Sequence, residues 1–317
     1  MSTEASHNIL PDGTPDSPPI STDPTPAVPW GWLRAVLFVL AYIVLTLVMA
    51  VVTVVVFGAA SQDDVIGLMS TPKGVIIQLI SFLATLLVVW AFRRGLDRRS
   101  LVSLGFTFDK SARRDLAAGM LWGAGLIGFI FVVLLVTGQI ALSELAFPVE
   151  AFLIQVALGV LVAASEETML RGYLLNNFMK SANKYLALLL VSVLFSLFHG
   201  FNPGLSMIGL VNIVLAGLLL GIYYVHRKNL WFPIGLHFTW NLFQGAVFGA
   251  PVSGLKFDSI ISFDPKGSEM LTGGEFGFEA SIITTVVMIL AAATIHWKYR
   301  PDGRVPVAGD SDAASAG

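Results

Sequence analysis

The sequence predicts an all-α, polytopic membrane protein, a bundle of eight transmembrane helices with both termini in the cytoplasm. Of its 317 residues, 55% are hydrophobic and only 13% are charged, and the mean hydropathy is +0.77. This composition lies far from that of an ordinary soluble domain. Long stretches carry no Asp, Glu, Lys or Arg, and the basic residues gather on alternate connections between those stretches. A bilayer core about 30 Å thick needs roughly 20 apolar residues per helix, so the stretches can be counted as spans.

Seven charge-free stretches can each hold at least one span. The longest contains 42 residues, and Asn202-Pro203-Gly204 near its middle is a turn signal, so we expect two helices there. The span that begins at residue 151 is expected to continue past its charged end to about Asn177. The stretches are residues 35–62, 74–92, 116–143, 151–165, 185–226, 229–255 and 280–297.

The basic residues set the predicted orientation. With the N-terminus in the cytoplasm, fifteen of the nineteen Lys and Arg residues lie in or beside cytoplasmic segments. Arg171 lies inside a span, and only Lys73, Lys256 and Lys266 fall outside. Cytoplasmic loops carry an excess of Lys and Arg, so we expect a multi-pass protein of the cell membrane with an N-in, C-in topology. The fifteen are Arg34, Arg93, Arg94, Arg98, Arg99, Lys110, Arg113, Arg114, Lys180, Lys184, Arg227, Lys228, Lys298, Arg300 and Arg304.

The domain organisation is simple. Residues 1–29 contain seven prolines and four acidic residues but no Lys or Arg, so they lack the basic start of a secretory signal. We expect them, like residues 301–317, to form a disordered cytoplasmic tail on a transmembrane domain of residues 30–300. The net charge of −2 gives no reason to expect a nucleic-acid partner, and the absence of cysteine excludes disulfides and a Cys nucleophile.

A few polar side chains are predicted to lie within the bilayer. Ionisable groups cost from about 2.5 kcal/mol upward at its centre, so each is a candidate functional residue. Counting from the predicted cytoplasmic helix ends places Glu166 level with His199, and a rise of about 1.5 Å per residue keeps His237 and Asn241 within about 10 Å of that depth. The set comprises Glu166, Glu167, Arg171, His199 and His237, with the amides Gln155, Asn212 and Asn241.

Three predicted helices each carry two notable side chains four residues apart, which places each pair on one helical face. In the first pair Glu167 is spaced to neutralise Arg171 and so to play a supporting role. Glu166 has the wrong spacing for that contact and is left to face a cavity. The pairs are Glu167 with Arg171, Phe195 with His199, and His237 with Asn241.

These residues form three short patterns, EExxxR at 166–171, FxxxH at 195–199 and HxxxN at 237–241. Each alone occurs by chance, but the ordered triple in consecutive hydrophobic segments is specific. It resembles the CAAX protease/bacteriocin-processing (CPBP) family, which includes the CAAX prenyl endopeptidase and bacterial Abi-type proteins. The resemblance covers a core of about residues 150–250.

The resemblance implies an intramembrane endopeptidase, with a peptide or membrane-protein substrate and the lipid bilayer as partners. It implies that Glu166 activates a water together with His199, while His237 and Asn241 stabilise the oxyanion. The chemistry is reasonable on independent grounds, because peptide hydrolysis needs a base near a water and donors aimed at the developing negative oxygen.

The sequence is compatible with a zinc enzyme and with an enzyme that needs no metal ion. Glu166, His199 and His237 could supply a Glu and two His to Zn²⁺, as in a metalloendopeptidase. They come from three helices without a short chelating pattern, and HExxH is absent. We favour metal-independent hydrolysis and assign no cofactor-binding residue.

Other functional classes stay open. A proton-coupled transporter would also use buried Glu and His residues, although the chain shows no internal repeat. A non-catalytic scaffold or bacteriocin-immunity protein could keep the same motifs and act by binding. Two small-xxx-small pairs, Gly119 with Gly123 and Gly217 with Gly221, indicate helix-packing seams rather than site features.

Overall fold

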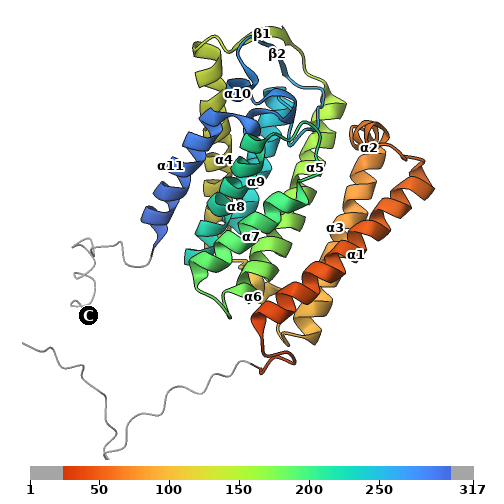
Figure 1. Ribbon diagram of the computed structural model, residues 1–317, viewed down its shortest axis with the longest axis vertical. Coiled ribbons are helices and arrows are strands. Elements are labelled where there is room, and N and C mark those ends of the chain that lie inside the picture. The colour runs from red at the N-terminus through yellow and green to blue at the C-terminus, as the bar shows by residue number, and fades with distance from the viewer. Residues whose placement is uncertain (1–23, 301–317) are drawn as a thin grey trace, which may run out of the picture.

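Most of the chain described by the computed structural model, residues 24–300, is helical (Figure 1). Six helical segments in these residues are long and apolar enough to cross a membrane, which confirms an all-α, multi-pass membrane architecture. The predicted tails lie outside the described residues, except for positions 24–29, which form no helix. The six are α1 (Gly31–Phe57), α3 (Pro72–Gly95), α4 (Lys110–Val136), the continuous segment Val149–Phe178, α8 (Met207–Arg227) and α11 (Ile282–Tyr299).

Two further apolar helices are shorter. They are α7 (Lys184–Phe198) and α9 (Trp231–Leu242), and α9 continues as a π-helical segment, Phe243–Val247. Both are shorter than the roughly 20 residues that a bilayer crossing requires. Helices thus occupy every predicted position, while the number of eight spans and the orientation stay predictions.

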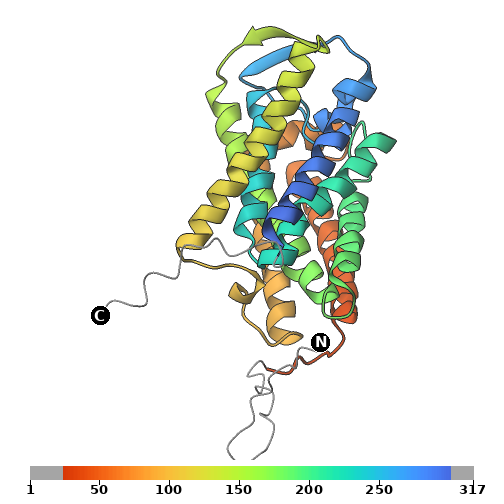
Figure 2. The ribbon, with the colours of Figure 1, turned by 90° about the vertical axis from the view of Figure 1, so that its left-hand side faces the viewer.

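Several helices end before the charge-free stretches do. α4 ends at Val136, and Gly138 then adopts a left-handed conformation with φ of 70°. The residues that follow form β1 (Ile140–Leu145), which pairs antiparallel with β2 (Ile261–Pro265). This sheet lies at the upper end of the bundle in Figures 1 and 2 and was not predicted, because apolar strands resemble apolar helices in composition.

Short polar side chains fix where the helices begin. Ser61 and Asp64 form a capping box at the start of α2 (Gln62–Met69). Asp109 caps α4 by accepting hydrogen bonds from the backbone N–H groups of Ser111 and Ala112. Such caps satisfy the unpaired N–H groups of the first turn and so set the register of each apolar segment. Similar caps are Asn183 for α7, Ser206 for α8 and Ser281 for α11.

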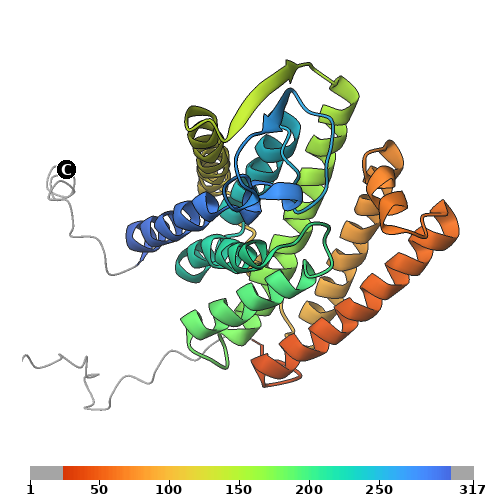
Figure 3. The same ribbon diagram turned by 45° about the horizontal axis from the view of Figure 1, so that its top comes forward.

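The connection between α9 and α11 covers the upper end of the bundle (Figure 3). Besides β2 it contains α10 (Glu269–Thr272) and two 3-10 turns, Gly274–Phe276 and Phe278–Ala280. A third 3-10 turn, Val102–Leu104, lies between α3 and α4. The upper connection therefore lies where it can roof a cavity between the helices.

α1 and α3 form a pair at one side of the bundle (Figures 1 and 3). Their lower ends meet at Asp97, whose carboxylate accepts hydrogen bonds from Arg34 and, at 3.1 Å, from Arg93. The Lys180 ammonium, from the turn after α6 (Asn176–Phe178), lies 3.9 Å from the same carboxylate. The two arginines are predicted as cytoplasmic flanks, yet both are only 1% exposed. This buried ion cluster ties the α1–α3 pair to the rest of the protein.

Glycine seams bring two helix pairs into close contact. A Cβ atom on Gly119 of α4 would lie 2.0 Å from the carbonyl oxygen of Phe232, and one on Gly123 would lie 2.3 Å from that of Leu236. On α8, a Cβ atom on Gly217 would lie 2.7 Å from the Cα of a residue in α7. Both predicted seams are confirmed. The first holds α9, which carries the HxxxN motif, against α4.

Replacing a seam glycine tests this packing. Gly123→Ala should lower the unfolding free energy by about 1–3 kcal/mol, because the added methyl group overlaps the α9 backbone. Gly125→Ala on the same helix is the matched control, since nothing lies within 4 Å of its added Cβ. Thermal unfolding of the purified variants in one detergent measures both. A melting temperature for Gly123→Ala at or above that of Gly125→Ala would contradict the close contact.

Candidate active site

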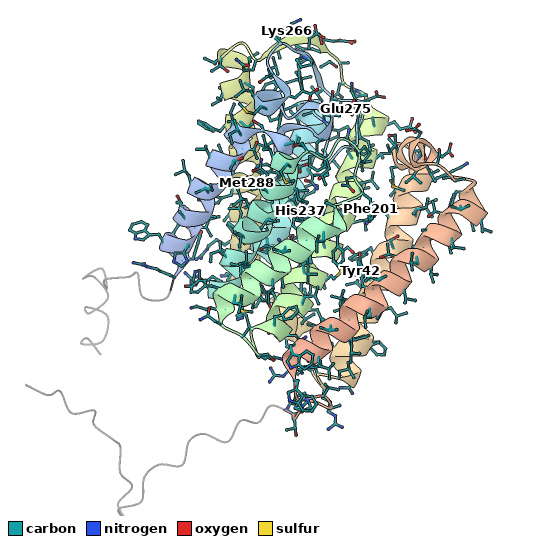
Figure 4. All side chains as sticks on the ribbon, viewed as in Figure 1. Tyr42, Phe201, His237, Lys266, Glu275 and Met288 are labelled. Atoms are coloured by element: carbon teal, nitrogen blue, oxygen red, sulfur yellow. The ribbon has the colours of Figure 1, made fainter. Side chains whose placement is uncertain are left out.

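A cavity of about 240 Å³ inside the bundle is lined by all four side chains predicted to be catalytic. Glu166 comes from α5 (Val149–Glu167), His199 directly follows α7, and His237 and Asn241 come from α9. Figure 4 shows His237 near the middle of the bundle. Three helices thus bring the three motifs to one cavity.

Most of the cavity wall is apolar. Val162, Leu220 and Trp240 are among its lining side chains. Charged groups in such surroundings are poorly screened, so each one interacts strongly with its neighbours. The few polar groups of the wall therefore determine what the cavity can bind.

Glu167 lies behind the cavity and is fully buried. Its Oε1 accepts a hydrogen bond from Nη1 of Arg171 at 2.8 Å, which confirms the predicted contact between the two side chains. The same oxygen lies 3.0 Å from Nδ1 of His237. The sequence patterns gave no sign of this second contact, because it joins residues 70 positions apart in the chain.

The Glu167 contact fixes the His237 ring. A carboxylate oxygen that already pairs with Arg171 can only accept, so Nδ1 of His237 carries the proton and donates. The opposite nitrogen, Nε2, then faces the cavity and lies 3.9 Å from Oε2 of Glu166. A histidine held through Nδ1 by a carboxylate is a common way of orienting Nε2 for chemistry.

Glu166 is less buried than Glu167 and does not share its hydrogen bonds to Arg171 and His237. Its side chain is 24% exposed, against 0% for Glu167. Its Oε2 has no hydrogen-bond partner among residues 24–300. Adjacent residues on a helix point about 100° apart, so one glutamate packs into the protein and the other faces the cavity.

His199 is oriented by its own helix. Its Nδ1 lies 2.8 Å from the carbonyl oxygen of Phe195, which can only accept, so Nδ1 donates and Nε2 is left for the cavity. The Phe195 ring packs edge-on against His199 at 4.7 Å and against His237 at 6.4 Å. The guanidinium carbon of Arg171 lies 4.9 Å from the centre of the same ring. The first residue of the FxxxH pattern thus packs against both histidines and the buried arginine.

The helix that carries the first motif changes its winding directly after Glu167. Residues Thr168–Leu175 are π-helical, and all eight are buried. π-helical turns are uncommon and are frequent at functional sites. The π-helical winding was not predicted. The expected contact between Glu167 and Arg171 nevertheless forms at the start of this segment.

Asn241 lines the cavity one turn after His237. Its amide makes no hydrogen bond to other groups in the described part of the chain. The amide is thus available to a bound molecule. The two amides without an assigned role, Gln155 and Asn212, also line the cavity but hold the covering segments by donating to the carbonyl oxygens of Asp258 and Ser281.

Glu279 is a cavity-lining acid that sequence reasoning missed. Its Oε2 accepts hydrogen bonds from the backbone N–H of Ser253 at 2.6 Å and from the Ser253 hydroxyl at 2.9 Å. Burial raises the pKa of the Glu279 carboxyl, although the Ser253 donors and the two cavity histidines act in the opposite direction. No spacing rule marks this residue, since it follows α9 by a long irregular segment.

Ser253 itself has a left-handed backbone, with φ of 48°, which is uncommon for a residue with a side chain. Its carbonyl oxygen accepts a hydrogen bond from the Asn202 amide at 3.0 Å. Glu279 and Asn202 therefore hold the segment 252–257, which roofs the cavity, from two sides.

The side chains that could hold Zn²⁺ are not gathered into a ligand set in this arrangement. Among residues 24–300, no three His, Asp or Glu side chains are arranged to hold a metal ion. Ligands bound at about 2.0–2.2 Å in a tetrahedral site lie roughly 3.4 Å apart. Glu166 Oε2 and His237 Nε2, two of the candidate ligand atoms, are separated by 3.9 Å.

The Glu279 contact can be tested by limited proteolysis, because Lys256 in the roof is exposed. Glu279→Ala leaves two donors of Ser253 unpaired at a cost of about 1–3 kcal/mol, so trypsin should cut after Lys256 about tenfold faster. Glu279→Gln keeps an acceptor oxygen and should be cut at the wild-type rate. Glu275→Ala, at an exposed position of the same connection, is a surface control. Equal rates for Glu279→Ala and wild type would show that Glu279 does not hold the roof.

Comparison with known proteins agrees with the motifs. Residues 148–243 match the family model described as Type II CAAX prenyl endopeptidase Rce1-like. No curated protein and no solved structure matches the chain. The matched segment includes all three motifs together with the helices that bring them to the cavity. This motif-bearing core therefore belongs to the CAAX protease/bacteriocin-processing family.

Proposed function

We propose that this chain is an intramembrane endopeptidase that hydrolyses peptide bonds of membrane-associated or hydrophobic substrates. One observation carries the proposal: the four motif side chains reach a single, mainly apolar cavity, with Glu166 Oε2 3.9 Å from His237 Nε2. The family match adds support, since its description names a CAAX prenyl endopeptidase.

In the proposed reaction Glu166 and His199 activate the attacking water. Glu166 has a free carboxylate oxygen, and His199 presents Nε2 because its Nδ1 is bonded to Phe195. The water loses a proton to Glu166 as its oxygen bonds to the scissile carbonyl carbon. Glu166 then gives the proton to the departing amine as the C–N bond breaks, so the carboxylate is regenerated.

His237 and Asn241 stabilise the negative oxygen of the intermediate. When both ring nitrogens of His237 carry a proton, Nδ1 donates to Glu167 and Nε2–H is a charged donor toward the cavity. The free amide of Asn241, one turn away on α9, supplies a second donor. Donors fixed before the reaction are effective because the protein need not reorganise as charge develops.

A carrier function has less support. A carrier that works by alternating access needs a route from its site toward each membrane face. The segment Thr168–Leu175, which follows Glu166 and Glu167 on the same helix, is entirely buried, so it lines no such route. A non-catalytic scaffold or immunity protein would keep the cavity without turnover. Cleavage of hydrophobic peptides by the protein in liposomes supports the enzyme, whereas solute flux in the same liposomes would support the carrier.

The first test compares the two adjacent glutamates. Glu166→Gln keeps the size of the side chain but removes the base, so it should keep the wild-type melting temperature and abolish single-turnover cleavage. Glu167→Ala leaves Arg171 unpaired and buried, which costs about 3–5 kcal/mol, so it should lose stability first. Glu150→Gln, at an exposed position of α5, serves as the control. A stable, inactive Glu167→Ala beside an active Glu166→Gln would exchange the proposed roles.

We also propose that hydrolysis is independent of metal. Exhaustive chelation should then leave the cleavage rate of purified protein unchanged, and added Zn²⁺ should not raise it. The measurement is single-turnover cleavage with metal analysis of the same sample. Stoichiometric zinc, with activity lost on chelation and restored by zinc, would establish a metal enzyme instead.

The proposed enzyme crosses the cell membrane eight times with both termini in the cytoplasm. Its partners are the lipid bilayer and a peptide or membrane-protein substrate. Reporter fusions test the topology: a fusion after Asp97 should report the cytoplasm and one after Asp264 the outside. The reverse result would invert the orientation, and two fusions on one side would require a different number of spans.

A further inference from the structure

Along the direction of the helices, the cavity extends from Glu166 toward only one end of the bundle. On α5 its lining residues run from Gln155 to Glu166, and none comes from the π-helical segment that follows. On α8, which begins near the roof, no lining residue lies beyond Leu220. The cavity therefore extends from Glu166 toward the end of the bundle that carries β1 and β2.

The other side of Glu166 is filled with packed side chains. Tyr173 and Leu174 in the π-helical segment are fully buried. Phe232 at the start of α9 is also fully buried, and Tyr224 near the end of α8 is 1% exposed. The described residues on this side of Glu166 are therefore closely packed, and the π-helical segment lines no part of the cavity.

The boundary of the cavity toward the β1–β2 end is partly exposed. The roof segment 252–257 contributes Ser253, Leu255 and Phe257, all of which are partly exposed. Met69 of α2 and Gln78 of α3 extend the lining toward the α1–α3 pair. A peptide can thus reach the site past the roof or between α3 and the bundle, and both approaches lie in the same half of the molecule.

The two ends of the bundle carry opposite charge. The end where α1 begins carries the basic residues of the loops, including Arg94, Arg114 and Lys184, which are exposed. The β1–β2 end is mainly acidic, and Figure 4 shows Glu275 and Lys266 there. Basic loops face the cytoplasm in membrane proteins, so the acidic end faces outward. The exposed acids of that end are Asp63, Asp64, Glu144, Glu150, Asp258, Asp264, Glu269 and Glu275.

We propose that the site is reached from the extracytoplasmic half of the membrane, and that its substrates are extracytoplasmic segments of exported or membrane-anchored proteins. This substrate class rests on the proposed peptidase function. The mainly apolar wall fits a hydrophobic segment at the edge of the bilayer. A prenylated tail at the cytoplasmic surface would meet the packed end of the bundle instead.

Cysteine accessibility tests the route without any need for activity, because the chain contains no cysteine. Three single-cysteine variants are sufficient. They are Lys256→Cys in the roof segment, Arg114→Cys at the basic end of the bundle, and Ala216→Cys in the cavity wall. A small, charged, membrane-impermeant thiosulfonate is applied to intact cells and to inverted vesicles. The proposal predicts that Lys256→Cys and Ala216→Cys react in intact cells, and that Arg114→Cys reacts only in inverted vesicles.

Other labelling outcomes overturn the proposal. Reaction of Ala216→Cys only in inverted vesicles, or in neither preparation, would remove the outward route. Reaction of Lys256→Cys only in inverted vesicles would place the cavity mouth in the cytoplasm.

Substrate profiling tests the second half of the proposal. New protein N-termini are compared between membranes that contain the wild-type chain and membranes that contain Glu166→Gln. The cleavage sites that depend on Glu166 should lie in extracytoplasmic segments of proteins of known topology. Cytoplasmic cleavage sites would overturn the substrate class and leave the peptidase function standing. If no site depends on Glu166, the proposed function fails and the substrate class falls with it, while the labelling result still decides the route.

Discussion

One buried ion pair joins four of the helices that line the cavity. Glu167 and Arg171 both come from the helix that carries the first motif, and their side chains meet at 2.8 Å. Arg171 donates to the carbonyl oxygen of Gly217 on α8 at 3.2 Å and lies over the Phe195 ring on α7. Glu167 accepts from His237 on α9. Because an unpaired buried charge is so unfavourable, the pair holds its neighbours in one arrangement.

The same pair explains why two adjacent glutamates can differ in chemistry. Glu167 uses Oε1 for two donors and stays behind the cavity wall. Glu166, turned by about 100°, lines the cavity, and its Oε2 has no hydrogen-bond partner in the described part of the chain. The orientation of His237 follows from Glu167, and the position of α9 follows from its close approach to Gly119 and Gly123. Site geometry therefore depends on a polar contact at one side of α9 and on backbone packing at the other.

Contacts within one helix were predictable from the sequence, whereas contacts between distant segments were not. The i,i+4 rule identified Glu167 with Arg171, and counting apolar residues placed the motif residues at common depth. The link from Glu167 to His237 and the link from Glu279 to Ser253 depend on how separate segments pack, which spacing does not encode. The burial of Arg34 was missed for a related reason, since a basic residue at a helix end normally indicates an exposed flank.

The protonation state of the His237 ring tests the central arrangement most directly. Solid-state nitrogen NMR of histidine-labelled protein in liposomes distinguishes a protonated ring nitrogen from a bare one, and His237→Asn identifies the signals. If Glu167 orients the ring, Nδ1 carries a proton at neutral pH. A neutral His237 with the proton on Nε2 and a bare Nδ1 would contradict the account.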